Sequence, residues 1–280
     1  MRKPPKGKSL AETNPALAAE WHPQLNGELT PCDISANSGK KVWWQCNKGP
    51  DHEWEAIVGN RVKGSGCSIC SGYKVVTSNC LQTTNPELAA EWHPTNNGTV
   101  KPFDIHAGSS KKVWWKCNKG PDHEWQAVID TRNRGSGCPI CAGKMVVKSN
   151  ALSTTHPELI KEWHPSKNNA ISPDEIHAGS SKRVWWKCDK GPDHEWSTVV
   201  YSRTTLGTDC PFCNGKKVSV TNSLSALRPD LVDQWHKSKN KNLRPNMVTV
   251  GSSKKVWWIC PSNNKHSWST SVAKRTDINN

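Results

Sequence analysis

The stretch that decides the fold begins with Lys111-Lys112-Val113-Trp114-Trp115-Lys116-Cys117, continues through His123-Glu124-Trp125, and ends with Cys138-Pro139-Ile140-Cys141. It holds three cysteines and one histidine, a set of side chains that binds zinc in preference to magnesium or calcium. Two of them lie at the ends of two strand-like segments, and the other two form a Cys-x2-Cys knuckle. Four protein ligands leave no coordination position for water, so we expect a structural rather than a catalytic zinc.

The same pattern recurs four times along the 280 residues. The Trp-Trp pairs are spaced by 71, 71 and 72 residues, at Trp43-Trp44, Trp114-Trp115, Trp185-Trp186 and Trp257-Trp258. A fixed period of this kind indicates a tandem array of small modules. We therefore expect a basic tail over 1–8, followed by repeats over 9–79, 80–150, 151–222 and 223–280.

Three of the copies carry the complete ligand set. The expected ligands are Cys46, His52, Cys67 and Cys70 in the first copy, Cys117, His123, Cys138 and Cys141 in the second, and Cys188, His194, Cys210 and Cys213 in the third. A disulfide framework and an iron or iron–sulfur site are the alternatives. A disulfide scheme would not require a histidine at the second position of every copy, and this favours zinc.

The fourth copy offers Cys260 and His266 as ligands, but the sequence ends at Asn280, about where the Cys-x2-Cys pair is due. Either the chain is a fragment of a longer protein, which we favour, or this copy is a half-site. Metal binding supplies the folding free energy of such small units, so we expect the fourth copy to be the least ordered.

Each copy is expected to be a small, zinc-dependent α+β module with one short helix and one β-hairpin. In the second copy we expect a helix over 84–92, with Thr84 or Asn85 as its cap and Pro86 in the first turn. Strands over 111–117 and 123–129 should pair as a hairpin, and a Gly-rich loop should lead to the knuckle. The chain has sixteen Trp but only two Phe and two Tyr, so metal and Trp should replace a large apolar core.

The combined pattern resembles a known family of tandemly repeated zinc-ribbon or treble-clef zinc fingers. The resemblance rests on Asn-Pro-Glu-Leu-Ala-Ala-Glu-Trp-His-Pro at 85–94 together with the stretch quoted above, and it covers about residues 9–280. It implies DNA-related work, because such arrays are sometimes found beside a nuclease domain similar to very-short-patch repair endonucleases. The departures are Ser68 in place of Pro139, a one-residue insertion in the third copy, and the incomplete fourth copy.

The charge of the chain points to a polyanionic partner. The formal net charge is +14, and three Cys3His zinc sites would lower it to roughly +11, since each adds about −1. We expect nucleic acid, with DNA favoured over RNA, and an associated nuclease or other protein as a further partner. No secretory signal or membrane-spanning run is visible, so we expect an intracellular protein that does not enter a membrane.

Basic residues recur at equivalent places in the four copies and predict a phosphate-binding track. Ordinary solvated charge is the alternative. Trp114 and its equivalents are expected in the core, although a Trp flanked by lysines could also stack a nucleobase; Trp115, Trp92 and Trp125 are also expected there. The predicted track comprises Lys40, Lys41, Arg61, Lys63, Lys111, Lys112, Arg132, Arg134, Lys182, Arg183, Arg203, Lys254, Lys255 and Arg275.

The leading functional hypothesis is therefore a zinc-binding repeat protein that binds nucleic acid, most simply duplex DNA, as the targeting part of a larger protein or complex. A protein-interaction scaffold is the alternative. His93 and Asn97 also recur in each copy and could belong to a His-Asn-His nuclease. We expect no catalysis, because His123 is already needed as a ligand and four nuclease centres in one chain would be unusual.

Overall fold

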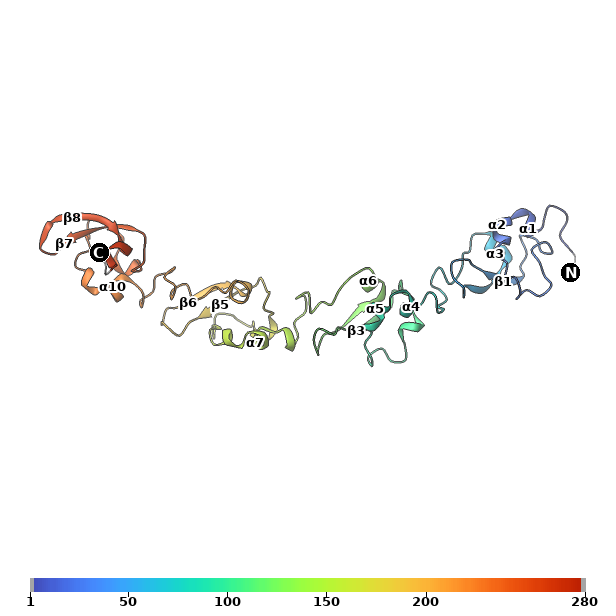
Figure 1. The fold of residues 1–280 in the computed structure, drawn as a ribbon, viewed down its shortest axis with the longest axis horizontal. Coiled ribbons are helices and arrows are strands. Elements are labelled where there is room, and N and C mark those ends of the chain that lie inside the picture. The colour runs from blue at the N-terminus through green and yellow to red at the C-terminus, as the bar shows by residue number, and fades with distance from the viewer. Residues whose placement is uncertain (1–2, 278–280) are drawn as a thin grey trace. The chain divides into compact units, whose positions relative to one another are not determined.

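The computed structural model describes residues 3–277, which fall into two compact units, one on each side of the Ala142–Gly143 junction. Each unit contains the hairpins of two copies of the repeat, and the repeated architecture can be followed by colour in Figure 1. No helix among these residues is both long and apolar enough to cross a membrane.

A two-stranded antiparallel hairpin forms the centre of every copy, as the alternation of buried and outward residues predicts. The second Trp of each Trp-Trp pair lies opposite the Trp that follows the His ligand, for example Trp115 opposite Trp125. The pairs are β1 (Lys41–Gln45) with β2 (Glu53–Ile57), β3 (Lys112–Lys116) with β4 (Glu124–Val128), β5 (Arg183–Lys187) with β6 (Glu195–Val199), and β7 (Lys255–Cys260) with β8 (Asn263–Ser271).

Two short helical turns precede each hairpin. The helix predicted over 84–92 corresponds to the second turn, with Asn85 as its cap and Pro86 in its first turn as expected, but it is shorter, and the turn before Asn85 was not predicted. In the second copy the break falls at Asn85, which has φ −149° and ψ 75°. The residue before a proline is disfavoured in helical conformation, and Pro86 follows Asn85 directly. Asn85 then caps the second turn by accepting a hydrogen bond from the Leu88 amide at 3.1 Å. The turns are α1 (Leu10–Thr13) and α2 (Pro15–Ala18), α4 (Leu81–Thr84) and α5 (Pro86–Ala90), α7 (Leu152–Thr155) and α8 (Pro157–Ile160), and α10 (Leu224–Leu227) with η4 (Pro229–Leu231).

A further helical turn follows each hairpin, where the sequence predicted only a Gly-rich loop. It comprises five residues, too few for a periodic pattern to reveal. In the second copy it ends before Gly135, whose φ of +96° terminates the turn. These turns are α3 (Val58–Val62), α6 (Ile129–Asn133), α9 (Val200–Thr204) and α11 (Val272–Thr276), and the remaining short 3-10 turns are η1 (Pro102–Asp104), η2 (Lys148–Asn150), η3 (Pro173–Glu175) and η5 (Pro245–Met247).

The second Trp of each pair is the centre of its module's core. Trp115 and its three equivalents are fully buried. The Trp115 ring meets the edge of the half-buried Trp92 ring at a centroid distance of 5.5 Å. The indole N–H of Trp115 donates to the carbonyl of Ala127 at 3.1 Å, so its polar group is satisfied inside the core. The core assignments of Trp115 and Trp125 are confirmed, and Trp92 lies at the edge of the core.

The first Trp of each pair points to the opposite face of the hairpin. Trp43 and Trp114 are half-buried, and Trp185 and Trp257 retain 37% and 38% of their surface. The expectation that these four residues belong to the core is therefore wrong for Trp185 and Trp257. Alternation along a strand places adjacent Trp residues on opposite faces, and only one face of each hairpin packs against the helical turns.

Candidate metal centres

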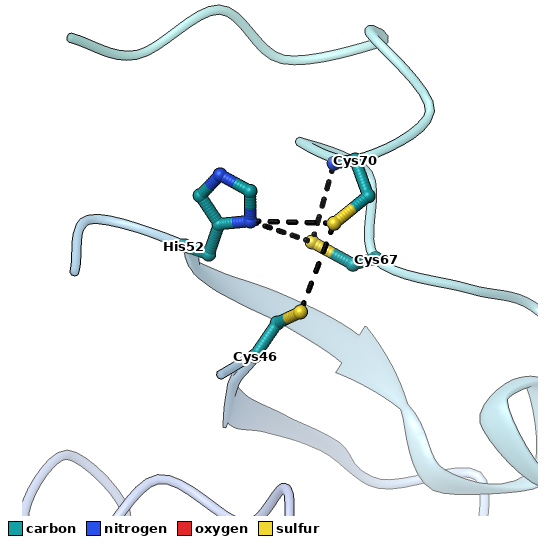
Figure 2. Close-up of side chains that lie close together, drawn as sticks. All are labelled: Cys46, His52, Cys67 and Cys70. Atoms are coloured by element: carbon teal, nitrogen blue, oxygen red, sulfur yellow. Dashed lines mark hydrogen bonds between the residues drawn. The ribbon is translucent and has the colours of Figure 1, made fainter. Parts of the chain in front are cut away.

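The first cluster is assembled from the two ends of a hairpin and a knuckle that lies beyond α3. Cys46 follows β1 directly, His52 immediately precedes β2, and Cys67 and Cys70 form the knuckle (Figure 2). The Sγ atoms of Cys46 and Cys70 lie 3.7 Å apart. Nδ1 of His52 is 3.3 Å from Cys70 Sγ and 3.9 Å from Cys67 Sγ. Although Cys70 is exposed as a residue, its sulfur faces the other three ligands.

These spacings fit a four-coordinate zinc. With Zn–S bonds of about 2.3 Å and Zn–N of about 2.0 Å, tetrahedral geometry puts the sulfurs about 3.8 Å apart and sulfur about 3.5 Å from nitrogen. A disulfide would need about 2.05 Å between the sulfurs, and all twelve cysteines are free, so the disulfide alternative is wrong. A bound Zn²⁺ would offset two of the three thiolate charges and tie the knuckle to the hairpin.

The second and third clusters repeat the first. The sulfur pairs Cys117–Cys141 and Cys188–Cys213 are each separated by 3.7 Å. The distances from histidine Nδ1 to the knuckle sulfurs are 3.4 and 3.8 Å in the second cluster and 3.5 and 3.7 Å in the third. Within each cluster, one ligand atom per residue lies within 4.8 Å of all the others. The chain therefore carries three complete Cys3His sites, in the copies for which the sequence predicted them.

The other side of the ligand histidine is also held in place. In the third cluster, Nε2 of His194 lies 3.1 Å from Ser219 Oγ and 2.9 Å from Thr221 Oγ1. Such a contact fixes the ring orientation and leaves Nδ1 to bind the metal. Both hydroxyl groups come from the segment that follows the knuckle.

A glycine in the hairpin turn makes room for the histidine ring. A Cβ atom at Gly120 would lie 2.5 Å from Cδ2 of His123, which is closer than real side chains approach. Gly49 and Gly191 have the same relation to His52 and His194. The Gly-Pro-Asp-His string in the first three copies carries this signal in the sequence, but the sequence analysis did not use it.

The aspartate of the same string anchors the chain beyond the knuckle. Asp51 accepts hydrogen bonds from the Ser78 hydroxyl and from the Ser78 amide, the latter at 2.9 Å. These bonds, led by that from the hydroxyl, lower the pKa of Asp51. In the third copy Asp193 accepts from the Val220 amide at 2.8 Å. The turn therefore positions the histidine and also holds the segment that leads to the next copy.

Crowding of three thiols in one cluster makes metal-free ionisation unfavourable. Burial, followed by the neighbouring Cys46 and Cys67 thiols, raises the pKa of Cys70 to about 12. The same causes raise the pKa of Cys141 to about 11 and that of Cys213 to about 12. Zinc binds thiolates, so loading each site must release protons, and acid must weaken zinc binding.

The fourth copy arranges its two expected ligands differently. Cys260 pairs with Asn263 inside the hairpin, and β8 runs through His266, which is exposed. Nε2 of His266 lies 3.2 Å from the side-chain nitrogen of Asn263. Asn263, Asn264 and Lys265 replace the Gly-Pro-Asp string, so the turn that would direct a histidine toward a cysteine is missing. Within residues 3–277, neither Cys260 nor His266 belongs to a complete ligand cluster.

Three arginines predicted to contact phosphate are instead buried, and this part of the prediction is wrong. Arg132 lies with its guanidinium carbon 5.2 Å from the ring centres of both Trp115 and Trp125 and forms an ion pair with Glu91. Arg61 and Arg203 repeat the arrangement with Glu20 and Glu162. The two indole rings, the Glu91 carboxylate and the Ser136 carbonyl together compensate the charge of the buried Arg132 guanidinium. Arg275 is half-buried and donates to Gln234, so it also serves the core.

The other predicted cations are exposed. Lys41 forms an ion pair with Glu55 at 2.8 Å, and Arg134 forms one with Asp130 at 2.6 Å. The exposed set consists of Lys40, Lys41, Lys63, Lys111, Lys112, Arg134, Lys182, Arg183, Lys254 and Lys255.

The recurring His and Asn support the backbone. Nδ1 of His93 accepts from the amides of Thr95 and Asn96 at 3.2 and 3.1 Å, and its Nε2 lies 3.1 Å from the Glu124 carboxylate. The Asn97 side chain accepts from the Trp114 amide at 2.8 Å and donates to the Trp114 carbonyl at 2.9 Å. Asn97 thus fastens the polar loop to β3, whereas His93 holds the loop backbone and contacts Glu124 on β4.

Comparison with known families agrees with this geometry. The family described as "probable treble clef zinc finger domain" matches residues 17–73, 88–144, 159–216 and 231–280. Each match begins in or just after the second helical turn, and the first three end just beyond the knuckle. No curated protein is significantly similar to the chain. The chain therefore belongs to the family of probable treble clef zinc finger domains and carries four tandem copies of that domain.

Proposed function

We propose that this array binds nucleic acid, duplex DNA in preference to RNA, through phosphate contacts made by the zinc-supported modules. The observation that carries the proposal is an exposed pair of cations at the start of the first strand of every hairpin, at Lys40-Lys41, Lys111-Lys112, Lys182-Arg183 and Lys254-Lys255. Exposed cations repeated at one structural position suit a repeating polyanion such as the phosphate backbone.

The role of zinc in this proposal is structural. Each complete cluster has four protein ligands and joins a knuckle to a hairpin whose outer face carries the cations. The metal would therefore preserve the spacing of the basic pairs and would not meet the nucleic acid. We also place the protein inside the cell, where its cysteines would stay reduced.

A salt titration tests the proposal. Anisotropy of a labelled random-sequence DNA duplex would be measured with the zinc-loaded chain between about 50 and 300 mM salt, beside an RNA duplex of equal length. Phosphate contacts predict a steep linear fall of log affinity with log salt, by about 0.9 for each contact. Lack of binding at the lowest salt would contradict the proposal. Salt-independent capture of a protein instead would favour an interaction scaffold.

We propose further that the array has no nuclease activity of its own. His93 and Asn97 are engaged with the backbone and with Glu124, as described above. His123 faces the zinc ligands. Incubation of plasmid DNA with the array and Mg²⁺ or Mn²⁺ tests this, and cleavage that disappears in His93→Ala would contradict it.

A further inference from the structure

The fourth copy differs from the other three in the charge of one loop. Loop 237–244 contains Lys237, Lys239, Lys241 and Arg244, and all four side chains are exposed. The equivalent loop of the first copy, 23–30, contains no cation. Loop 94–101 contains only Lys101, and loop 165–172 contains only Lys167. Four cations within eight residues therefore belong to this copy and not to the repeat.

Three of these cations line one pocket. The pocket has a volume of about 560 Å³ and is bounded by Lys237, Lys241 and Arg244, with Ser225 and Asn246 as further polar residues. None of its lining residues, all within 3–277, is acidic. The counterparts of Lys237, Lys241 and Arg244 in the third copy are Pro165, Asn169 and Ser172. Three separate replacements therefore place positive charge around the same cavity, which has the size of a small-ligand site.

Lys241 also occupies a position that favours glycine. Its φ is +51°, and the equivalent residues are Gly27 at +58°, Gly98 at +60° and Asn169 at +52°. A lysine rarely adopts this left-handed conformation, whereas Gly and Asn do so readily. Local propensity therefore does not account for Lys241, while its place in the wall of the pocket is consistent with a role in binding.

The outer face of the same module lacks the carboxylate that the other copies have. In the third copy Glu195 forms ion pairs with Lys167 at 2.5 Å and Lys187 at 3.3 Å. Ser267 takes the place of Glu195, and Lys239 donates to its hydroxyl at 2.6 Å. Nζ of Lys239 also lies 4.3 Å from the ring centre of the exposed Trp257. The charge of Lys239 is therefore not offset by an acid at this position.

We propose that loop 237–244 is the main phosphate-binding element of the array and receives the sugar–phosphate backbone of a nucleic-acid strand. This inference rests on the proposed function and specifies where binding is strongest. Lys237, Lys241 and Arg244 contact phosphates at the pocket, and Lys239 contacts a phosphate beside Trp257. The shared chemistry is the phosphodiester, so the site does not select a base sequence.

The third copy supplies the residues for a test that preserves the fold. The triple variant Lys237→Pro, Lys241→Asn, Arg244→Ser installs the residues that the third copy carries at the same positions, with nearly the same φ at Asn169 and Lys241. A matched control, Lys48→Gln, Lys119→Gln, Lys190→Gln, removes the same charge from exposed residues at one equivalent position in the first three copies, outside the basic pairs. The full zinc-loaded chain is used, and zinc content and circular dichroism confirm that both variants fold.

Binding to labelled duplex and single-stranded DNA of two unrelated sequences is then measured across salt concentrations. The loop variant is expected to lose roughly 10- to 100-fold in affinity and about 2 to 3 from the salt slope, as three lost phosphate contacts would predict. The control should lose less than about threefold. Equal losses in both variants, full affinity in the loop variant, or a loss limited to one sequence would overturn the inference and leave the proposed function standing. Failure of the unmodified chain to bind any nucleic acid would overturn both.

Discussion

The second and fourth copies have cores of the same kind but differ at the tip of the hairpin. Trp115 and Trp258 are both fully buried, and both meet a Trp edge-on at about the same distance. In the second copy the hairpin ends in a Gly-Pro-Asp turn that directs His123 toward three cysteines. In the fourth copy β8 runs through His266, with a shift of register between Ile259 and Cys260, and Trp268 is 36% exposed where Trp125 is 4% exposed. All four copies therefore have the Trp-centred core, whereas the closed hairpin tip is found in the copies that have the complete ligand set.

The largest effect should come from removing one ligand of the second copy. Cys138→Ser should abolish its zinc site and unfold that copy, because structural zinc contributes on the order of 10 kcal/mol to such units. The first and third copies should remain folded, since arrays couple mainly through neighbours. Zinc analysis and hydrogen exchange resolved by copy measure this, and loss of all zinc would show that the modules are not independent. Cys260→Ser in the fourth copy should leave the zinc content unchanged.

A second large effect is expected at the buried arginine. Arg132→Ala leaves Glu91 without its cation and removes the group that packs between two indoles. Glu91 is 39% exposed and can be solvated, so the loss comes mainly from the desolvated contacts of the guanidinium and should destabilise the second copy by about 2–4 kcal/mol. Arg275→Ala should cost the fourth copy only about 1 kcal/mol, the net value of a typical hydrogen bond. Hydrogen exchange resolved by copy measures the free energy of unfolding. Equal losses of stability for the two variants would contradict the claim that Arg132 is the more tightly integrated of the two arginines.

The glycine beside the ligand histidine should have an intermediate effect. Gly120→Ala places a methyl group 2.5 Å from the His123 ring, so the ring must shift away from its ligand position. We expect zinc affinity of the second copy to fall roughly 10- to 100-fold, the range found when ligand orientation is disturbed. Gly137→Ala is the matched control, because nothing lies within 4 Å of its added methyl. Competition with a zinc chelator would detect the difference. Equal zinc affinities of the two variants would show that Gly120 does not help to position His123.

The smallest effect should come from the carboxylate that distinguishes the third copy from the fourth. The Lys167 hydrogen bond and then that of His164 lower the pKa of Glu195 to about 2, so Glu195 is ionised at neutral pH. Its stabilising ion pairs are present above the unfolded pKa near 4.3 and are lost as the pH falls toward 2.

Glu195→Gln should raise DNA affinity about two- to threefold, and Ser267→Glu should lower it by a similar factor, because each changes one charge near exposed lysines. DNA affinities are read from binding isotherms. A lower affinity for Glu195→Gln or a higher affinity for Ser267→Glu would contradict the placement of phosphate contacts on this face of the hairpin.

Much of the fold and of the metal sites follows from local patterns. The period of Trp and Cys, the hairpins and the three complete ligand sets depend on residues that are close in sequence or repeated at fixed spacing. Alternation along the strand placed Trp115 correctly because the metal face and the core face coincide. The treble-clef ligand set could therefore be identified before its geometry was known.

The errors concern contacts that join distant parts of a module. Arg132 reads as an exposed cation until its partner Glu91, 41 residues earlier, is seen beside it. The sequence predicts Trp185 to lie in the core, but the structure shows that only one face of the hairpin is covered. The five-residue turn at Ile129–Asn133 is too short to produce a helical period. The role of the Gly-Pro-Asp string depends on how closely Gly120 approaches His123, which spacing alone does not reveal.

The central claim is that three closed Cys3His sites, and no fourth within residues 3–277, each stabilise the module that contains them. Zinc titration of the metal-free chain, followed by Trp fluorescence and near-ultraviolet circular dichroism, tests it most directly. We predict that both signals change together and saturate at three equivalents of zinc per chain. Saturation at four equivalents, or full ordering of the Trp residues before any zinc is added, would contradict the account.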